Sequence, residues 1–168
     1  MKQKKVLVVG LGLIGGSMAA AISEKTPHAV FGHDVDGETV RKALSDGAIA
    51  RAWEGETDPD LVLVALYPSA AIQFLREWGP KFAPSCVVVD LCGVKQSVCD
   101  AAKEIFTEGK AVFVGGHPMA GREVWGYAGA SASLFEKASM ILTPFEGTDK
   151  AVLTFLEEFF LSLGFGRI

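Results

Sequence analysis

Two groups of residues in this sequence have types and spacings that could do chemistry. The first is Gly10-x-Gly12-x-x-Gly15, which follows a short apolar run and opens a helical pattern. In such a turn the first glycine permits a tight bend, the second lets the backbone approach a pyrophosphate, and the third lets the helix pack on the strand. Backbone N–H groups and the positive end of the helix dipole then favour phosphate. We therefore expect a dinucleotide site that includes Gly10, Gly12, Leu13, Ile14 and Gly15.

Asp34 lies about 20 residues after the glycine-rich turn, at the end of the next apolar run. A carboxylate at this position accepts hydrogen bonds from ribose hydroxyls and repels a 2′-phosphate. The residues that follow it, Val35-Asp36-Gly37, include no Arg or Lys. The pattern therefore favours NAD over NADP. A ligand-free turn, or an aspartate that is merely solvated, is the alternative.

The second group surrounds His117, in the segment His-Pro-Met-Ala-Gly-Arg-Glu after a predicted strand. It would lie at the carboxyl edge of the sheet, where open α/β folds bind ligands, and histidine can transfer protons near neutral pH. A lone histidine in a Gly-rich loop is, however, more often structural or solvated than catalytic. Other strand ends could contribute to the cofactor site, with plain turn chemistry as the alternative for the first three: Leu66, Tyr67, Pro68, Cys92 and Gly93.

The elements that must position these residues alternate along the chain. Apolar, β-branched runs predict strands at 5–9, 29–33, 61–66, 86–91, 111–114 and 139–142. Amphipathic patterns predict helices at 13–23, 38–45, 69–82, 97–106 and 150–163, with Ser69 as the cap of the third. This alternation predicts the α/β class, a Rossmann-like, doubly wound, mainly parallel sheet with helices on both faces.

Composition excludes several classes of protein. The 168 residues, 49% hydrophobic and 21% charged, are typical of one globular domain. A net charge of −4 argues against a nucleic-acid partner, and no apolar run approaches the ~20 residues that span a bilayer. The three cysteines, Cys86, Cys92 and Cys99, lack metal-ligand spacing, so we expect no metal and a reducing, cytoplasmic location.

Four segments together resemble the prephenate/arogenate dehydrogenase family over essentially the whole chain. They are Gly10–Ser17, Val89–Lys95, Gly116–Glu123 and Leu134–Pro144, and His-Pro-Met-Ala-Gly is the most specific part. The resemblance implies an NAD-dependent oxidative decarboxylation of prephenate or arogenate in tyrosine biosynthesis. It also implies that His117 accepts a hydrogen bond from the substrate hydroxyl and stabilises the charge that develops there as hydride departs.

One position departs from the family pattern. The family commonly carries Gly-Ser-Val-Lys after the corresponding strand, and its serine helps orient the histidine and the cofactor. Here the residues are Cys92-Gly93-Val94-Lys95, and Gly93 has no hydroxyl. His117 must then be oriented by water, backbone or another side chain, for which the Cys92 thiol is a poor hydrogen-bonding candidate.

Several further residues have open roles. Lys95 could reach an anionic group near the nicotinamide or be solvated. Arg122 and Glu123 could face the substrate mouth or form a surface ion pair. We expect His28 to lie on the surface, with no catalytic role. The tryptophans follow no pattern that assigns them.

The segment Phe165–Ile168 predicts the opening of one more strand, and no element follows it. We therefore expect residues 1–168 to be a dinucleotide-binding domain whose C-terminal helical domain is absent. The resemblance implies that such a domain completes the substrate pocket and forms a homodimer, so this part alone should have little activity. Two alternatives remain open: another Rossmann dehydrogenase, of the β-hydroxyacid or imine reductase type, and a non-catalytic NAD-binding regulatory module.

Overall fold

The computed structural model describes residues 2–56 and 58–168 of the chain. A seven-stranded sheet with the order β3-β2-β1-β4-β5-β6-β7 forms its centre. Strands β1 to β6 pair in parallel, and β7 pairs antiparallel with β6 at one edge. The strands are β1 (Lys5–Val9), β2 (Ala29–His33), β3 (Arg51–Ala52), β4 (Leu61–Val64), β5 (Val87–Asp90), β6 (Val112–Pro118) and β7 (Met140–Pro144).

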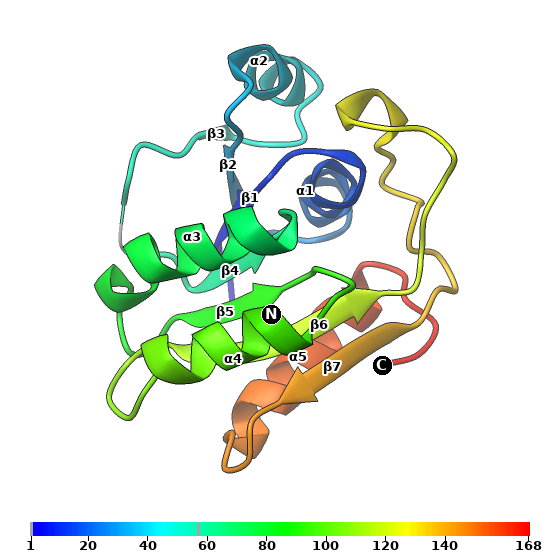
Figure 1. Cartoon of the computed structure of the whole chain (residues 1–168). Helices are drawn as coiled ribbons and strands as arrows, with labels where there is room; N and C mark the ends of the chain where they lie inside the picture. The colour runs from blue at the N-terminus through cyan, green and yellow to red at the C-terminus, as the bar shows by residue number, and fades with distance from the viewer. Residues whose placement is uncertain (1, 57) are drawn as a thin grey trace.

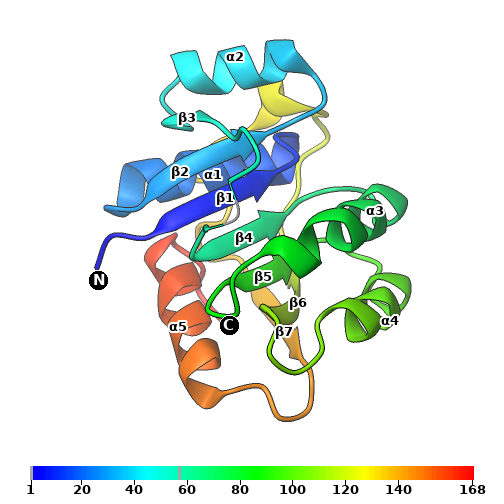
Figure 2. The same cartoon turned by 90° about the vertical axis from the view of Figure 1, so that its left-hand side faces the viewer.

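Helices cover both faces of the sheet (Figure 1). Figure 2 shows α3 and α4 on one side of the strands and α5 on the other. The α-helices are α1 (Leu13–Lys25), α2 (Gly37–Ser45), α3 (Pro68–Trp78), α4 (Gln96–Ile105) and α5 (Lys150–Ser162), and the 3-10 turns are η1 (Gly79–Lys81) and η2 (Tyr127–Gly129). The predicted Rossmann-like, doubly wound α/β class is confirmed.

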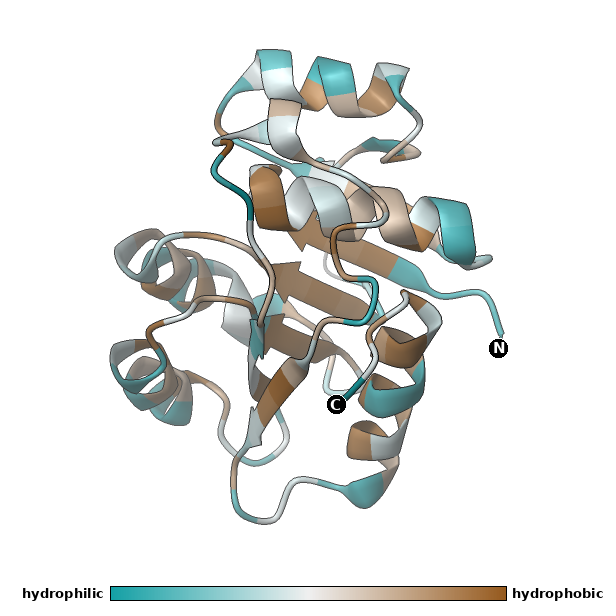
Figure 3. Cartoon of the chain, turned by 90° about the vertical axis from the view of Figure 1, so that its right-hand side faces the viewer, coloured by the Kyte–Doolittle hydropathy of each residue, from teal (hydrophilic) through white to brown (hydrophobic). Residues whose placement is uncertain are grey.

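Each face of the sheet has its own apolar core, because successive residues of a strand point to opposite faces. On one face Val6 packs among residues of α1 and α5, such as Phe160. On the other face Leu7 packs among residues of α3 and α4, such as Leu75. Strands that are buried on both faces are apolar along their whole length, and Figure 3 shows them as brown arrows in the middle of the molecule.

Strand β6 is longer than the sequence predicts. It continues past the expected end at Val114 as far as Pro118, because antiparallel β7 pairs with its second half. The Gly116 position in this pairing is tight, since a Cβ there would lie 3.0 Å from Cγ1 of Val89 and 3.1 Å from the Asp90 carbonyl oxygen. His117 therefore stands opposite Ile141 within a strand, and its expected position in a loop after the strand is wrong.

Helix α3 also differs from its prediction. It begins at Pro68 with Tyr67 as its N-cap, so Ser69 is an internal residue and not the cap. Proline suits the first helical position because it has no N–H to leave unpaired. The helix ends at Trp78, before Gly79-Pro80, and continues only as the 3-10 turn η1, because a proline inside an α-helix removes a backbone hydrogen bond.

The structure differs from two sequence predictions that lie outside the site. His28 is buried, not on the surface, and its ring stacks on Phe159 at 5.9 Å between centroids. The segment Phe165–Ile168 contributes a single parallel bridge, between Arg167 and Ser139, and not a full strand. Within the described residues no helix combines the length and apolar character needed to cross a membrane.

Candidate functional site

The site lies where the strand order reverses. From β1 the chain moves to β2 and β3 on one side of the sheet, and then to β4 and β5 on the other. Open α/β sheets bind ligands at the carboxyl ends of strands flanking such a reversal. A cleft of about 970 Å³ opens there. Most of the predicted cofactor-binding residues line it, namely Gly10, Gly12, Leu13, Ile14, Asp34, Leu66, Tyr67, Cys92 and Gly93.

The glycine-rich turn joins β1 to α1, and its three glycines do different things. Gly10 has φ of +85°, and a Cβ there would lie 2.4 Å from the Ala65 carbonyl oxygen. A Cβ on Gly15 would lie 1.7 Å from the Gly10 carbonyl oxygen, so the helix can approach the turn only without one. Gly12 has nothing within 4 Å of its Cβ position and no side chain to cap α1. Backbone N–H groups at the start of α1 therefore remain available to a ligand.

Asp34 holds the same turn from the end of β2. Its Oδ2 accepts a hydrogen bond from the Leu11 N–H at 2.7 Å, and its Oδ1 accepts one from the Asp36 N–H at 2.9 Å. Each carboxylate oxygen has a second lone pair, so Asp34 can still accept from a ribose hydroxyl in the cleft that it lines. One side chain thus shapes the turn and also lines the cleft.

Aromatic side chains form much of the cleft wall, and sequence reasoning missed this. Trp53, Phe74 and Trp78 line the cleft together, with the two indole centroids 4.5 Å apart. Trp125 also lines the cleft and is 83% exposed. All three tryptophans of the chain therefore face one cleft. They are far apart in the sequence and follow no period, so no local signal could have grouped them.

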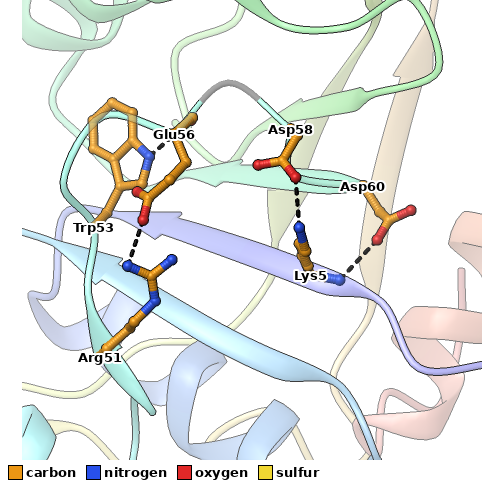
Figure 4. A network of polar contacts seen from close by, with 6 residues as sticks. All are labelled: Lys5, Arg51, Trp53, Glu56, Asp58 and Asp60. Carbon is orange, nitrogen blue, oxygen red and sulfur yellow. Dashed lines mark hydrogen bonds and ion pairs between the residues drawn. The ribbon is translucent and has the colours of Figure 1, made fainter.

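A polar network on the segment between β3 and β4 fixes Trp53 (Figure 4). The Trp53 indole N–H donates to the Glu56 carbonyl oxygen at 3.0 Å, and the Glu56 carboxylate pairs with Arg51. Lys5 on β1 donates its backbone N–H to Asp60 at 2.8 Å and pairs through Nζ with Asp58. These contacts tie the connection to β1, which positions Trp53 in the cleft wall.

The predicted catalytic histidine lies beside Gly93. A Cβ on Gly93 would be 3.2 Å from Cε1 and 3.6 Å from Nδ1 of His117. That Nδ1 atom is buried and has no hydrogen-bond partner in the described part of the chain. The position where the family commonly has a serine thus directly faces the histidine ring. His117 does not itself line the cleft, whereas its neighbour Gly93 and the adjacent Cys92 do.

A buried ion pair shapes this region. The Asp90 carboxylate is fully buried, accepts a hydrogen bond from the Cys92 N–H at 3.0 Å and pairs with the Lys95 ammonium. Burial raises the pKa of Asp90 above its usual value, and the hydrogen bond and positive charge of Lys95 oppose that shift. We call the segment from Asp90 to Lys95, together with His117, the histidine corner. Its acidic residue, Asp90, is the last residue of the apolar strand β5, which is a signal that sequence reasoning passed over.

Three sequence predictions lie just outside the cleft lining. Gly15 lies beneath the turn, and Pro68 is the first residue of α3, behind Tyr67. Lys95, whose partner the sequence leaves open, pairs with Asp90. Among the described residues no cluster of His, Cys, Asp and Glu is suited to hold a metal ion.

The fold, the cleft at the strand reversal and the glycine-rich turn define a Rossmann-type nucleotide-binding domain. A family model described as prephenate dehydrogenase, nucleotide-binding domain, matches residues 18–167. The prephenate dehydrogenase of Bacillus subtilis is 36% identical over 158 residues, which are 89% of this chain and 42% of that protein. The chain therefore belongs to the prephenate dehydrogenase nucleotide-binding domain family.

Solved structures agree with this assignment. The crystal structure of Synechocystis arogenate dehydrogenase is 28% identical with a TM-score of 0.87, and the match covers 98% of this chain and 58% of that one. The Aquifex aeolicus prephenate dehydrogenase in complex with hydroxyphenyl propionate and NAD+ is 27% identical with a TM-score of 0.84. That match covers 100% of this chain and 60% of the other. The chain thus spans less than two thirds of the length of each of these relatives.

Proposed function

We propose that residues 1–168 bind NAD in the cleft and are the nucleotide-binding domain of a prephenate or arogenate dehydrogenase. One observation carries the proposal: the glycine-rich turn and Asp34 line the same cleft as Gly93, and the Gly93 position lies directly against the His117 ring. This arrangement suits hydride transfer, because a nicotinamide bound beside Cys92 and Gly93 would lie next to the strand end that carries His117.

The residues present fit NAD. The open Gly12 position lets a pyrophosphate approach the first N–H groups of α1. The Asp34 carboxylate can accept from the adenosine ribose and would repel a 2′-phosphate. Leu66, Tyr67 and Cys92 would border the nicotinamide end. NAD, when bound, supplies the hydride acceptor.

We assign His117 the role of accepting a hydrogen bond from the hydroxyl of the substrate ring. As hydride leaves the carbon that bears this hydroxyl, positive charge develops on the oxygen. A neutral imidazole stabilises that charge where it forms. Loss of the ring carboxylate as CO2 then gives an aromatic ring. His117 can do this only in its neutral form, so turnover should fall as the histidine becomes protonated.

The whole protein's partners follow from the same proposal. The relatives are longer than this chain, and a helical second domain of the kind that the resemblance implies would complete the substrate pocket and the homodimer. The three free cysteines suit a reducing, cytoplasmic compartment. Family membership argues against a different Rossmann dehydrogenase, whereas a regulatory module without turnover remains the competing function to test.

The experiment compares wild type and His117→Asn in the full-length gene product, with prephenate and arogenate in separate assays. We expect NAD reduction with at least one substrate, and a loss of kcat by 100-fold or more, of the order seen for general acid–base groups, in the variant. NAD affinity should be unchanged. Near-normal turnover by His117→Asn contradicts the role of the histidine. Tight NAD binding without turnover on either substrate would favour the regulatory module.

A further inference from the structure

The segment after β6 forms the outer wall of the cleft, next to α1. Arg122, Val124 and Trp125 all line the cleft. The Val124 side chain lies 3.0 Å from the Cβ position of Gly129, and that position is 3.3 Å from Cδ1 of Leu13, the first residue of α1. This segment therefore lies beside the end of α1 that faces the cleft.

Contacts farther along hold the same segment on α1. The Tyr127 ring lies 2.7 Å from the Cβ position of Gly16, and the Ser131 N–H donates to Oγ of Ser17 at 2.9 Å. Both α1 residues belong to the first turns of that helix. Arg122 is thus carried on a segment that is fixed against the helix terminus where a dinucleotide pyrophosphate would bind.

The cleft lining carries more than one carboxylate, so a pyrophosphate bound there would need a positively charged side chain to balance its charge. The Asp34 and Glu77 carboxylates line the cleft, and Arg122 is the lining side chain that carries a permanent positive charge. The glycine-rich turn supplies only backbone N–H groups, since residues 10–17 include no Lys or Arg. In the described part of the chain Arg122 is exposed and takes part in no ion pair.

We propose that the Arg122 guanidinium binds the pyrophosphate of the dinucleotide and closes the cleft wall over it. The proposal rests on the proposed function, because it requires NAD in this cleft. A guanidinium presents two parallel N–H donors to a phosphate, which gives short, charge-assisted hydrogen bonds. Arg122 lies five residues after His117 along the chain, so the segment that leaves the histidine corner would itself contact the cofactor.

The test measures dissociation constants of the 168-residue chain by calorimetry, for NAD and for ADP-ribose, at low and high NaCl. ADP-ribose retains the pyrophosphate and lacks the nicotinamide. The variants are Arg122→Gln, Arg122→Lys and, as a control with the same change of net charge, Lys110→Gln. Lys110 is exposed and precedes β6, so it lies at the amino end of this strand, whereas Arg122 follows its carboxyl end. Thermal unfolding should be the same for all variants, because neither side chain is buried.

We expect Arg122→Gln to weaken both ligands by about tenfold at low salt, and to reduce the salt dependence of both. Arg122→Lys should recover part of the affinity, since an ammonium keeps the charge without the paired donors. Lys110→Gln should match wild type. Unchanged affinity in Arg122→Gln overturns the proposal, as does a loss for NAD alone, which would place Arg122 at the nicotinamide or substrate. If the wild-type chain bound neither ligand, the proposed function itself would fail.

Discussion

The glycine-rich turn and the histidine corner lie along the same edge of one sheet, yet they are held in different ways. The turn is fixed by backbone sterics and by Asp34, whose hydrogen bonds reach residues that are adjacent in the fold's first βαβ unit. The histidine corner depends on a buried ion pair between Asp90 and Lys95 and on an antiparallel edge strand. Backbone geometry therefore fixes the shape of the glycine-rich turn, whereas the shape of the histidine corner depends on contacts between charged side chains.

The largest expected effect comes from breaking the buried pair. Lys95→Met leaves the fully buried Asp90 carboxylate without its cation, which should lower the free energy of unfolding by about 3–5 kcal/mol at neutral pH. The loss should shrink in acid, because burial already raises the pKa of Asp90 and the carboxyl can then protonate. Urea unfolding at two pH values measures both.

Lys103→Met is the matched control, since Lys103 pairs with Asp100 on the exposed surface of α4 at 3.7 Å. It should change stability by less than about 1 kcal/mol. Equal losses in the two lysine variants would show that burial of the pair at the histidine corner has no special energetic consequence.

The effect of one added methyl group on the free energy of unfolding should depend on its position in the glycine-rich turn. Gly15→Ala places a Cβ 1.7 Å from the Gly10 carbonyl oxygen, so α1 must shift, at a cost of about 1–3 kcal/mol in unfolding free energy. Gly12→Ala meets nothing within 4 Å and should lose less than about 1 kcal/mol, the difference between Gly and Ala at an N-cap.

NAD affinity should separate the same two variants, because the Gly12 methyl enters the cleft. Thermal unfolding together with NAD titration distinguishes the roles. Two variants with the same stability would contradict the packing assigned to Gly15, and unimpaired NAD binding by Gly12→Ala would contradict the approach of phosphate to this residue.

Gly93→Ser should add to the histidine corner the hydroxyl that this sequence lacks. The new Cβ would lie 3.6 Å from Nδ1 of His117, so a hydroxyl on it can reach that buried nitrogen. Relative to Gly93→Ala, which adds the methyl without the hydroxyl, the serine should increase unfolding free energy by about 1 kcal/mol. A shift of the imidazole 15N resonance of Nδ1 in the serine variant alone would report the bond. Identical spectra for the two variants would contradict it.

The smallest effect concerns His28, which lies outside both regions. Burial, and then the charge of Lys4, lower the pKa of His28 below its usual value of 6.5. The unfolded chain therefore takes up this proton at a higher pH than the folded chain does. Stability should be unaffected well above pH 6.5 and should decline as pH falls from there through the folded-state pKa.

His28→Gln should flatten that decline in unfolding free energy. A decline of unchanged size in His28→Gln would show that other groups cause it.

The same contrast explains which parts of the fold and of the site could be predicted from the sequence. The turn, Asp34 and most strands were predictable because glycine spacing and short apolar runs are local signals with a direct steric meaning. The loop position expected for His117 was wrong because the extension of β6 depends on pairing with β7, more than twenty residues away. The burial of His28 and the gathering of the tryptophans were likewise set by tertiary packing, which no local period records.

The most direct test of the central claim is a titration of the 168-residue chain with NAD, followed by tryptophan fluorescence. Because Trp53, Trp78 and Trp125 all line the cleft, NAD should change the emission saturably, and NADP should do so only at a much higher concentration because Asp34 repels its 2′-phosphate. An emission that does not respond to NAD, or that responds equally to NADP, would contradict the assignment of this cleft as an NAD site.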